Sequence, residues 1–83
     1  MSEQIKSIQQ LKELAGREGV GIECSILLNG GLKSTKDIFY TEKTNMFEVF
    51  NYIDNTTQLL SEAELFTNSN IGLAITKGAL IID

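Results

Sequence analysis

The segment from Asn29 to Lys36 is the part of the sequence best suited to hold an anion. It combines glycines, whose backbone N–H groups can surround an anion, with hydroxyl and lysine side chains. A phosphate-binding P-loop needs glycine directly before its lysine and again five residues earlier, but Leu32 and Leu27 stand there. It also needs a following helix, whereas residues 37–40 read as a strand, so nucleotide hydrolysis is excluded. A simpler anion site and an ordinary polar hairpin both stay open. The candidate ligand-binding residues are Asn29, Gly30, Gly31, Lys33, Ser34 and Lys36.

Groups able to perform catalysis are scarce in this chain. Histidine, the commonest general base at neutral pH, is absent. Cys24, Ser25 and Ser34 therefore lack the partner that would activate them as nucleophiles. Cys24 also lies on the apolar side of a predicted strand, which favours a packed core thiol. We expect no catalytic residue, and the alternative is a small hydrolase or transferase that uses carboxylates alone. Those carboxylates would be Glu48, Asp54, Glu62 and Glu64.

Metal and cofactor sites are not expected either. A single cysteine and no histidine exclude the usual zinc ligand sets. The run from Asp54 to Gln58 has oxygen ligands, but an EF-hand needs glycine and glutamate where Leu59 and Leu65 stand. The sequence thus indicates neither a bound metal nor a cofactor.

The charge of the chain is unevenly distributed. Positive and negative side chains balance over residues 1–41, so the net charge of −4 comes from residues 42–83. No basic residue lies between Lys43 and Lys77. A nucleic-acid binder gathers Lys and Arg on one face, which makes a nucleic-acid partner unlikely here. The acidic half could meet a basic protein or imitate a phosphate backbone, or it could simply keep a small domain in solution.

Length and composition indicate one small domain, residues 1–83. The longest apolar run, residues 79–82, is far too short to span a membrane. The first residues lack a signal-peptide pattern, and there is no cysteine pair to form a disulfide. We therefore expect a cytoplasmic protein.

Apolar spacing predicts the N-terminal elements. Positions three and four apart between Ile5 and Ala15 predict a helix over residues 3–15, capped by Ser2 and ended by Gly16. The spacing then changes to two, which predicts strands over residues 20–28, 36–41 and 46–53. Short polar links join the three strands, so we expect an antiparallel meander.

The C-terminal part carries the sharpest helix signal. Ser61 and Glu64 form a capping-box pattern, and Leu60 and Leu65 stand at the positions of a hydrophobic staple. They predict a short helix over residues 62–67. Residues 71–82 fit either a second short helix, ended by Gly78 and followed by an apolar tail, or a hairpin, and the flanking Asn and Gly favour the helix. The predicted fold is α+β, a three-stranded antiparallel meander with an N-terminal helix and two short C-terminal helices.

Apolar residues occur on both faces of the predicted meander. Phe47 and Val49 point one way from the third strand, whereas Phe50 and Tyr52 point the other way. Aromatic rings on a sheet can stack nucleic-acid bases, but that requires basic residues among them. We expect helices to cover one face and a partner chain to cover the other.

The last apolar residues, Leu80, Ile81 and Ile82, are predicted to form an interface. They are too apolar to remain in water, since burying one such side chain is worth about 1.5–3 kcal/mol. The segment could dock on the chain's own sheet or on the edge strand of a second copy. We favour the second copy, because a domain with a small core gains much from added burial.

Several patterned stretches together cover about half of the chain. They are Leu28-Asn29-Gly30-Gly31-Leu32-x-Ser34, Phe47-x-Val49-x-Asn51-x-Ile53-Asp54, Thr57-Gln58-x-Leu60-Ser61-x-x-Glu64-Leu65 and Asn70-Ile71-Gly72-x-Ala74-Ile75-x-Lys77-Gly78-Ala79. In these stretches the chain is similar to small uncharacterised proteins of phages and bacterial mobile elements. The resemblance implies an accessory protein that binds something, a class that includes inhibitors of host defences, and carries no known activity or residue role.

Taken together, these observations predict a non-enzymatic binding protein that forms a homo-oligomer. Its partner would be a host protein that it inhibits or a small anionic ligand that it sequesters. The alternative remains the carboxylate-dependent hydrolase or transferase.

Overall fold

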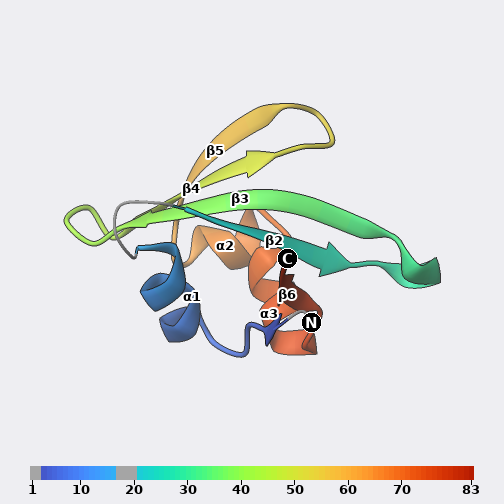
Figure 1. Ribbon diagram of the computed structural model, residues 1–83. Coiled ribbons are helices and arrows are strands. Elements are labelled where there is room, and N and C mark those ends of the chain that lie inside the picture. The colour runs from blue at the N-terminus through green and yellow to red at the C-terminus, as the bar shows by residue number, and fades with distance from the viewer. Residues whose placement is uncertain (1–2, 17–20) are drawn as a thin grey trace.

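The computed structural model describes residues 3–16 and 21–83 (Figure 1). Its helices are α1 (Ile8–Ala15), α2 (Glu64–Thr67) and α3 (Ile71–Lys77), and a short 3-10 turn spans Asn29–Gly31. Its strands are β1 (Glu3–Gln4), β2 (Ile22–Leu27), β3 (Lys33–Thr41), β4 (Met46–Asn51), β5 (Thr56–Ser61) and β6 (Leu80–Ile82). Among these residues, no helix is long and apolar enough to cross a bilayer.

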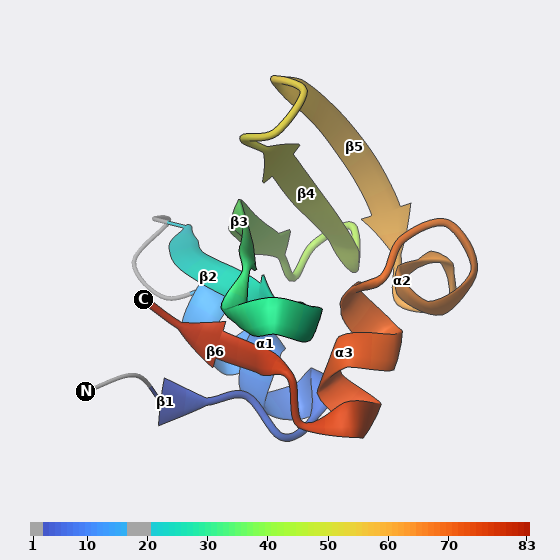
Figure 2. The same ribbon diagram turned by 90° about the vertical axis from the view of Figure 1, so that its right-hand side faces the viewer.

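Within the described residues, the strands form one six-stranded sheet in the order β1-β6-β2-β3-β4-β5. Every neighbouring pair is antiparallel. Strands β2 to β5 are consecutive in the chain, whereas β6 enters the sheet between β1 and β2. All the helices described lie on one side of the sheet, and the β4–β5 hairpin rises away from them (Figures 1 and 2). We call the helix-covered side the inner face and the opposite side the outer face.

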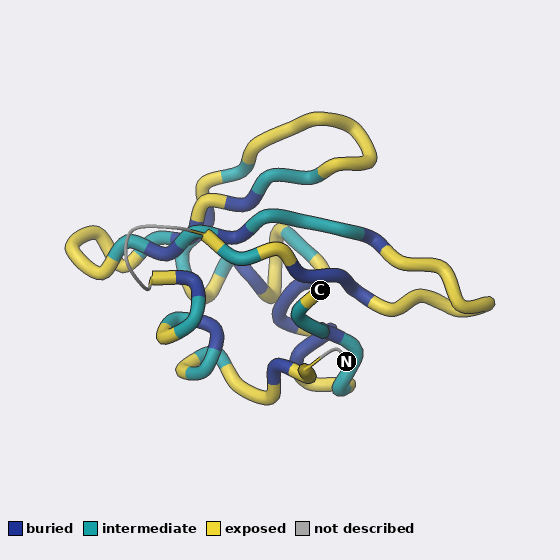
Figure 3. Tube along the Cα trace, viewed as in Figure 1, coloured by how far each residue is buried: buried dark blue, intermediate teal, exposed yellow. Residues whose placement is uncertain are grey.

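The hydrophobic core lies between the inner face and the helices. Alternate strand positions supply it, because successive side chains point to opposite faces of a sheet. Ile38 on β3 pairs with Val49 on β4, and Tyr40 pairs with Phe47, so two adjacent apolar pairs join these strands on the inner face. The helices cover this side of the core with Leu11 and Ala15 of α1 and with Ile71 and Ile75 of α3. Buried residues therefore concentrate in the middle of the molecule, and the hairpin tips are exposed (Figure 3).

The α+β class was predicted correctly, but the three-stranded meander was wrong, because three further strands belong to the sheet. Strand β5 is absent from the prediction, because the only element predicted between residues 53 and 71 is the short helix over residues 62–67. In the structure residues 52–55 form the turn after β4, and Asn55 adopts a left-handed φ of 56°. The chain then returns along β4 as β5, whose Thr56 and Thr57 have the branched side chains that favour strands.

The N-terminal helix begins later than predicted. Ser7 caps it, with its Oγ accepting from the backbone N–H of Gln10 at 3.1 Å. The predicted cap, Ser2, lies outside the described residues, as does Val20 at the start of the first predicted strand. Residues 3–4 form β1 instead, and the Ile5 N–H donates to the Leu80 carbonyl at 2.8 Å. The predicted end at Gly16 is correct, since its N–H bonds to the carbonyl of Lys12.

Residues 71–77 form the predicted helix rather than a hairpin. Gly78 ends it with a left-handed φ of 72°, and its N–H donates to the carbonyls of Ala74 and Ile75. The chain then enters the sheet as β6, where Leu80 is fully buried and Ile81 and Ile82 are partly buried. The preference for pairing with a second copy is corrected here. Both edges of β6 already pair with β1 and β2 of the same chain.

The capping box is present as predicted. The Ser61 backbone N–H donates to Glu64 Oε1 at 2.9 Å, and the Glu64 N–H donates to Ser61 Oγ at 3.2 Å. These hydrogen bonds to Glu64 lower the pKa of its carboxyl group. The box therefore fixes the direction in which the chain leaves β5 and enters α2.

Replacing Leu80 by Ala should lower the free energy of unfolding by about 2–5 kcal/mol, because it opens a cavity in the core. Urea denaturation measures this change. Leu32→Ala is the control, since Leu32 is 66% exposed at a hairpin tip and should change the midpoint little. Equal midpoints for Leu80→Ala and the wild type would contradict the burial of β6.

Replacing Ser61 by Ala should cost about 0.5–2 kcal/mol of stability, because the N-terminal N–H of α2 loses its acceptor. Ser61→Thr keeps the hydroxyl and is the control. The lowered pKa of Glu64 means that its contribution is present above its usual pKa and is lost as the pH falls through the lower folded value. Denaturation midpoints measured from neutral pH downward test both points. A Ser61→Ala protein that unfolds like the wild type at every pH would disprove the role of the box.

Candidate functional site

The predicted anion-binding loop does not form one site. Asn29, Gly30 and Gly31 make the exposed tip of the β2–β3 hairpin. Beyond the tip, alternation along β3 sends the remaining side chains to opposite faces. Lys33 lies on the outer face, 3.9 Å from Asp83 Oδ1. Ser34 and Lys36 follow on the inner face. The candidate residues are therefore divided among the hairpin tip and the two faces of the sheet, and Lys36 lies away from the tip on the inner face.

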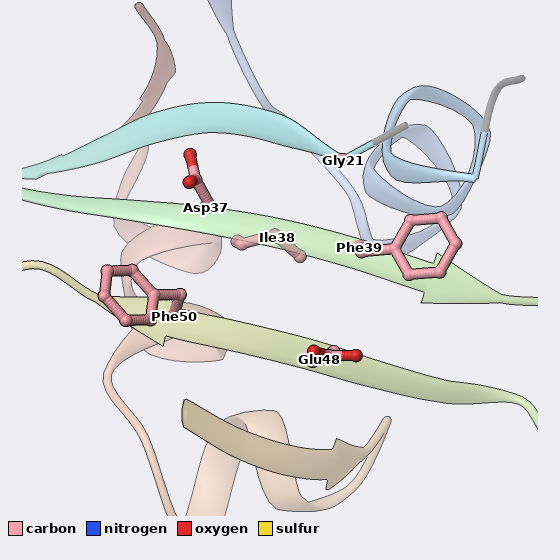
Figure 4. A pocket seen from close by; sticks show the side chains of 6 residues that line it. All are labelled: Gly21, Asp37, Ile38, Phe39, Glu48 and Phe50. Atoms are coloured by element: carbon pink, nitrogen blue, oxygen red, sulfur yellow. The ribbon is translucent and has the colours of Figure 1, made fainter. Parts of the chain in front are cut away.

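The outer face carries a shallow hollow over the middle of β3 and β4. It measures about 300 Å³ and is lined by Asp37, Phe39, Glu48 and Phe50, together with Gly21 and Ile38. Figure 4 shows Asp37 and Phe39 on β3 and Phe50 and Glu48 on β4 around this space. Phe39 is opposite Glu48, and Asp37 is opposite Phe50, so carboxylates and rings alternate along and across the strands.

Tyr52 holds one end of this hollow in place. Its hydroxyl donates to Asp37 Oδ2 at 2.5 Å, and its ring meets Phe50 edge-on with centroids 5.1 Å apart. The hydrogen bond to the Asp37 carboxylate raises the pKa of Tyr52 to about 12, because the carboxylate retains the hydroxyl proton. Asp37 is thereby oriented by a neutral donor, and it contributes negative charge to the face.

Gly21 allows the start of β2 to approach this hollow. A Cβ atom at Gly21 would lie 2.8 Å from the Ile38 carbonyl oxygen, closer than such atoms come in proteins. Glycine is therefore required at this position for the close approach of β2 and β3. The outer hollow thus depends on a residue with no functional group of its own.

A second, more polar space lies on the inner face beyond the core. This cleft of about 560 Å³ separates the far end of the β3–β4–β5 strands from the α2–α3 connection. Lys36, Asn51 and Thr56 stand opposite one another on adjacent strands and line one wall. Phe66 and Asn68 belong to the other wall. We call this space the Lys36 cleft.

The four carboxylates of the alternative enzyme are engaged in other contacts or exposed. Glu62 pairs with Lys12 Nζ at 2.6 Å, and Glu64 belongs to the capping box. Asp54 accepts hydrogen bonds from the Thr56 hydroxyl and N–H, which lower its pKa. Glu48 is exposed on the outer face. Their lowered pKa values move Asp54 and Glu64 further from neutrality than ordinary carboxyl groups, which does not suit a general acid.

The candidate nucleophiles are placed like structural residues. Cys24 is fully buried, and this burial raises the pKa of its thiol to about 12. Ser25 is also buried, with its hydroxyl 2.5 Å from Asp83 Oδ2 and 3.1 Å from Thr35 Oγ1. Over residues 3–16 and 21–83, no group of three His, Cys, Asp or Glu side chains is arranged to hold a metal ion.

Comparisons of the chain with protein-family profiles, with curated proteins and with solved structures found no match. The geometry of its own residues is therefore the basis for a functional conclusion.

Several of the residues that line these spaces were missed from the sequence. Asp37 is predicted only as part of a strand, Gln58 enters only through the rejected calcium loop, and neither Asn51 nor Asn68 is predicted as a site residue. One signal was available: on β4, Asn51 continues the alternation that places Phe47 and Val49 in the core, yet it is polar. A polar residue at a core-facing position indicates either the end of the core or a binding site.

Proposed function

We propose that this chain is a non-enzymatic binding protein whose outer sheet face covers a basic surface on a partner protein. The observation that carries the proposal is the hollow formed by Asp37, Phe39, Glu48 and Phe50 on a sheet face that none of the described helices covers. By covering such a surface, the protein would inhibit or sequester its partner.

Charge and ring geometry favour an arginine-rich partner. Glu23 pairs with Asp37 across β2 and β3, so it adds a third carboxylate to the same face. An arginine side chain can stack on an aromatic ring and pair with a neighbouring carboxylate at once. Phe39 with Glu48, and Phe50 with Asp37, offer two such combinations on adjacent strands.

Self-association, the other part of the proposed function, is best placed at β5. This strand is the six-residue edge of the sheet, and its sequence from Thr56 to Ser61 has no charged residue and no proline. Natural edge strands usually carry such residues to prevent pairing. An antiparallel β5–β5 pair around a twofold axis would be self-complementary, and it would extend the sheet and leave the outer hollow open.

Titration of the labelled protein with an arginine-rich peptide, followed by NMR, tests the outer face. Shifts should concentrate at Glu23, residues 37–39 and residues 48–50. The double variant Asp37→Asn/Glu48→Gln should bind about tenfold more weakly, because two charge pairs are lost. Glu3→Gln/Glu13→Gln removes the same charge from elsewhere and is the matched control. Equal weakening by the two double variants would mean that the peptide responds only to net charge, and the proposal would fail.

Replacing Leu59 by Lys should shift the protein towards monomer, because a lysine on an edge strand opposes pairing. Leu59 is 65% exposed, and the equally exposed Leu32 at the β2–β3 tip gives the control Leu32→Lys. Light scattering over a range of protein concentrations measures the change. Wild-type protein that stays monomeric at high micromolar concentration would rule out self-association at β5.

A further inference from the structure

We propose that the Lys36 cleft binds a small organic anion, with Lys36 as the charged anchor and the Phe66 ring as an apolar wall. The cleft opens on the inner face of the sheet, so this proposal is independent of the outer face.

Along β3, β4 and β5 the inner face becomes polar toward the turn that joins β4 to β5. Ile38 and Val49 are a buried cross-strand pair, but the next inner pair along these strands is Lys36 and Asn51. Thr56 continues that polar row on β5. Three strands thus present polar groups together, in register, on the face that elsewhere forms the core. These polar groups therefore form one continuous wall across the three strands.

A chain of hydrogen bonds holds Lys36 in this wall. Its Nζ donates to Asn51 Oδ1 at 2.5 Å, and Asn51 Nδ2 donates to Thr56 Oγ1 at 3.4 Å and to Gln58 Oε1 at 3.3 Å. Gln58 Nε2 then donates to the Asn68 carbonyl at 3.3 Å, which ties the strands to the α2–α3 connection. Lys36 is therefore positioned by side chains that are themselves held in place.

Lys36 lacks a carboxylate partner among the residues that the structure describes. Asp54 is the carboxylate that lines the cleft, and it accepts from Thr56 instead. Burial lowers the pKa of Lys36, opposed by the nearby charge of Asp54. Its ammonium has three N–H groups and one acceptor here, Asn51. A partly buried cation with free donors is suited to an incoming anion.

The Phe66 ring forms a fixed wall of the same cleft. It is 50% exposed and rests on Gly72 of α3, where a Cβ atom would lie only 2.4 Å from a ring carbon. Glycine at position 72 thus lets the ring lie flat against the helix. The exposed part of the ring is available to a planar or apolar group of the ligand. The cleft volume of about 560 Å³ is in the ordinary range for small-molecule sites.

Benzoate and phenyl phosphate test the proposal, because both join an anionic group to a ring and differ only in that group. In NMR titrations of the full chain, at least one should cause saturable shifts at Lys36, Asn51 and Phe66. The better binder identifies carboxylate or phosphate as the preferred group. Benzamide, which is neutral and similar in shape, should bind more weakly. Saturation by neither anion, or equal binding of benzamide, would overturn the proposal.

Variants of Lys36 test the anchor. Lys36→Gln should weaken binding roughly tenfold or more, because a charge-assisted hydrogen bond is lost, whereas Lys36→Arg should retain most of it. Lys33→Gln removes a lysine from the same strand but from the opposite face, and should change affinity less than about twofold. The NMR spectrum of each variant establishes that it is folded. If Lys36→Gln binds like the wild type, or no more weakly than Lys33→Gln, Lys36 is not the anchor.

Gly72→Ala tests the ring wall without removing the ring, because the new methyl group would displace Phe66. Both probes should bind several-fold more weakly to this variant. Phe66→Leu should weaken binding in the same direction. Unchanged affinity in both variants would mean that the Phe66 ring takes no part in binding.

Discussion

The pairing of β6 between β1 and β2 is the constraint on which the rest of the structure depends. It brings Leu80 into the core and gives the segment before α1 a place in the sheet. The Ile5 N–H bonds to the Leu80 carbonyl, so the approach to α1 is also set by this strand. With α1 and α3 held on one side, the inner face is covered and the outer face is left for other contacts.

The alternation of side chains along each strand then determines which groups can act together. On β3 it separates Lys33 from Lys36, although the two lysines are close in sequence. On β3 and β4 it places Asp37, Phe39, Glu48 and Phe50 on one face, with Ile38 and Val49 behind them. The same rule makes the outer hollow acidic and aromatic and makes the inner face apolar until the strands pass the helices.

Local signals in the sequence predicted several local parts of this fold, although not the β4–β5 hairpin. The capping box at Ser61 and Glu64, the glycine after α3 and the alternation of β3 and β4 were all read correctly, because each depends on residues close together in the chain. Strands β1 and β6 could not be placed in the same way, since their pairing joins distant segments. For the candidate site, the sequence identified Lys36 but grouped it with a loop, because the partner Asn51 becomes its neighbour only through strand register.

The order of the strands has a consequence for folding kinetics. Strands β2 to β5 join sequence neighbours, so they can pair with little loss of loop-closure entropy, whereas β6 must close most of the chain. We therefore expect the hairpins to form first and β6 to enter last. Before β6 enters, β2 has an open, largely apolar edge. The β6 strand of another molecule can pair with this edge through the same hydrogen bonds as the chain's own β6. At high concentration that intermediate is the state from which two chains would exchange β6 and become domain-swapped.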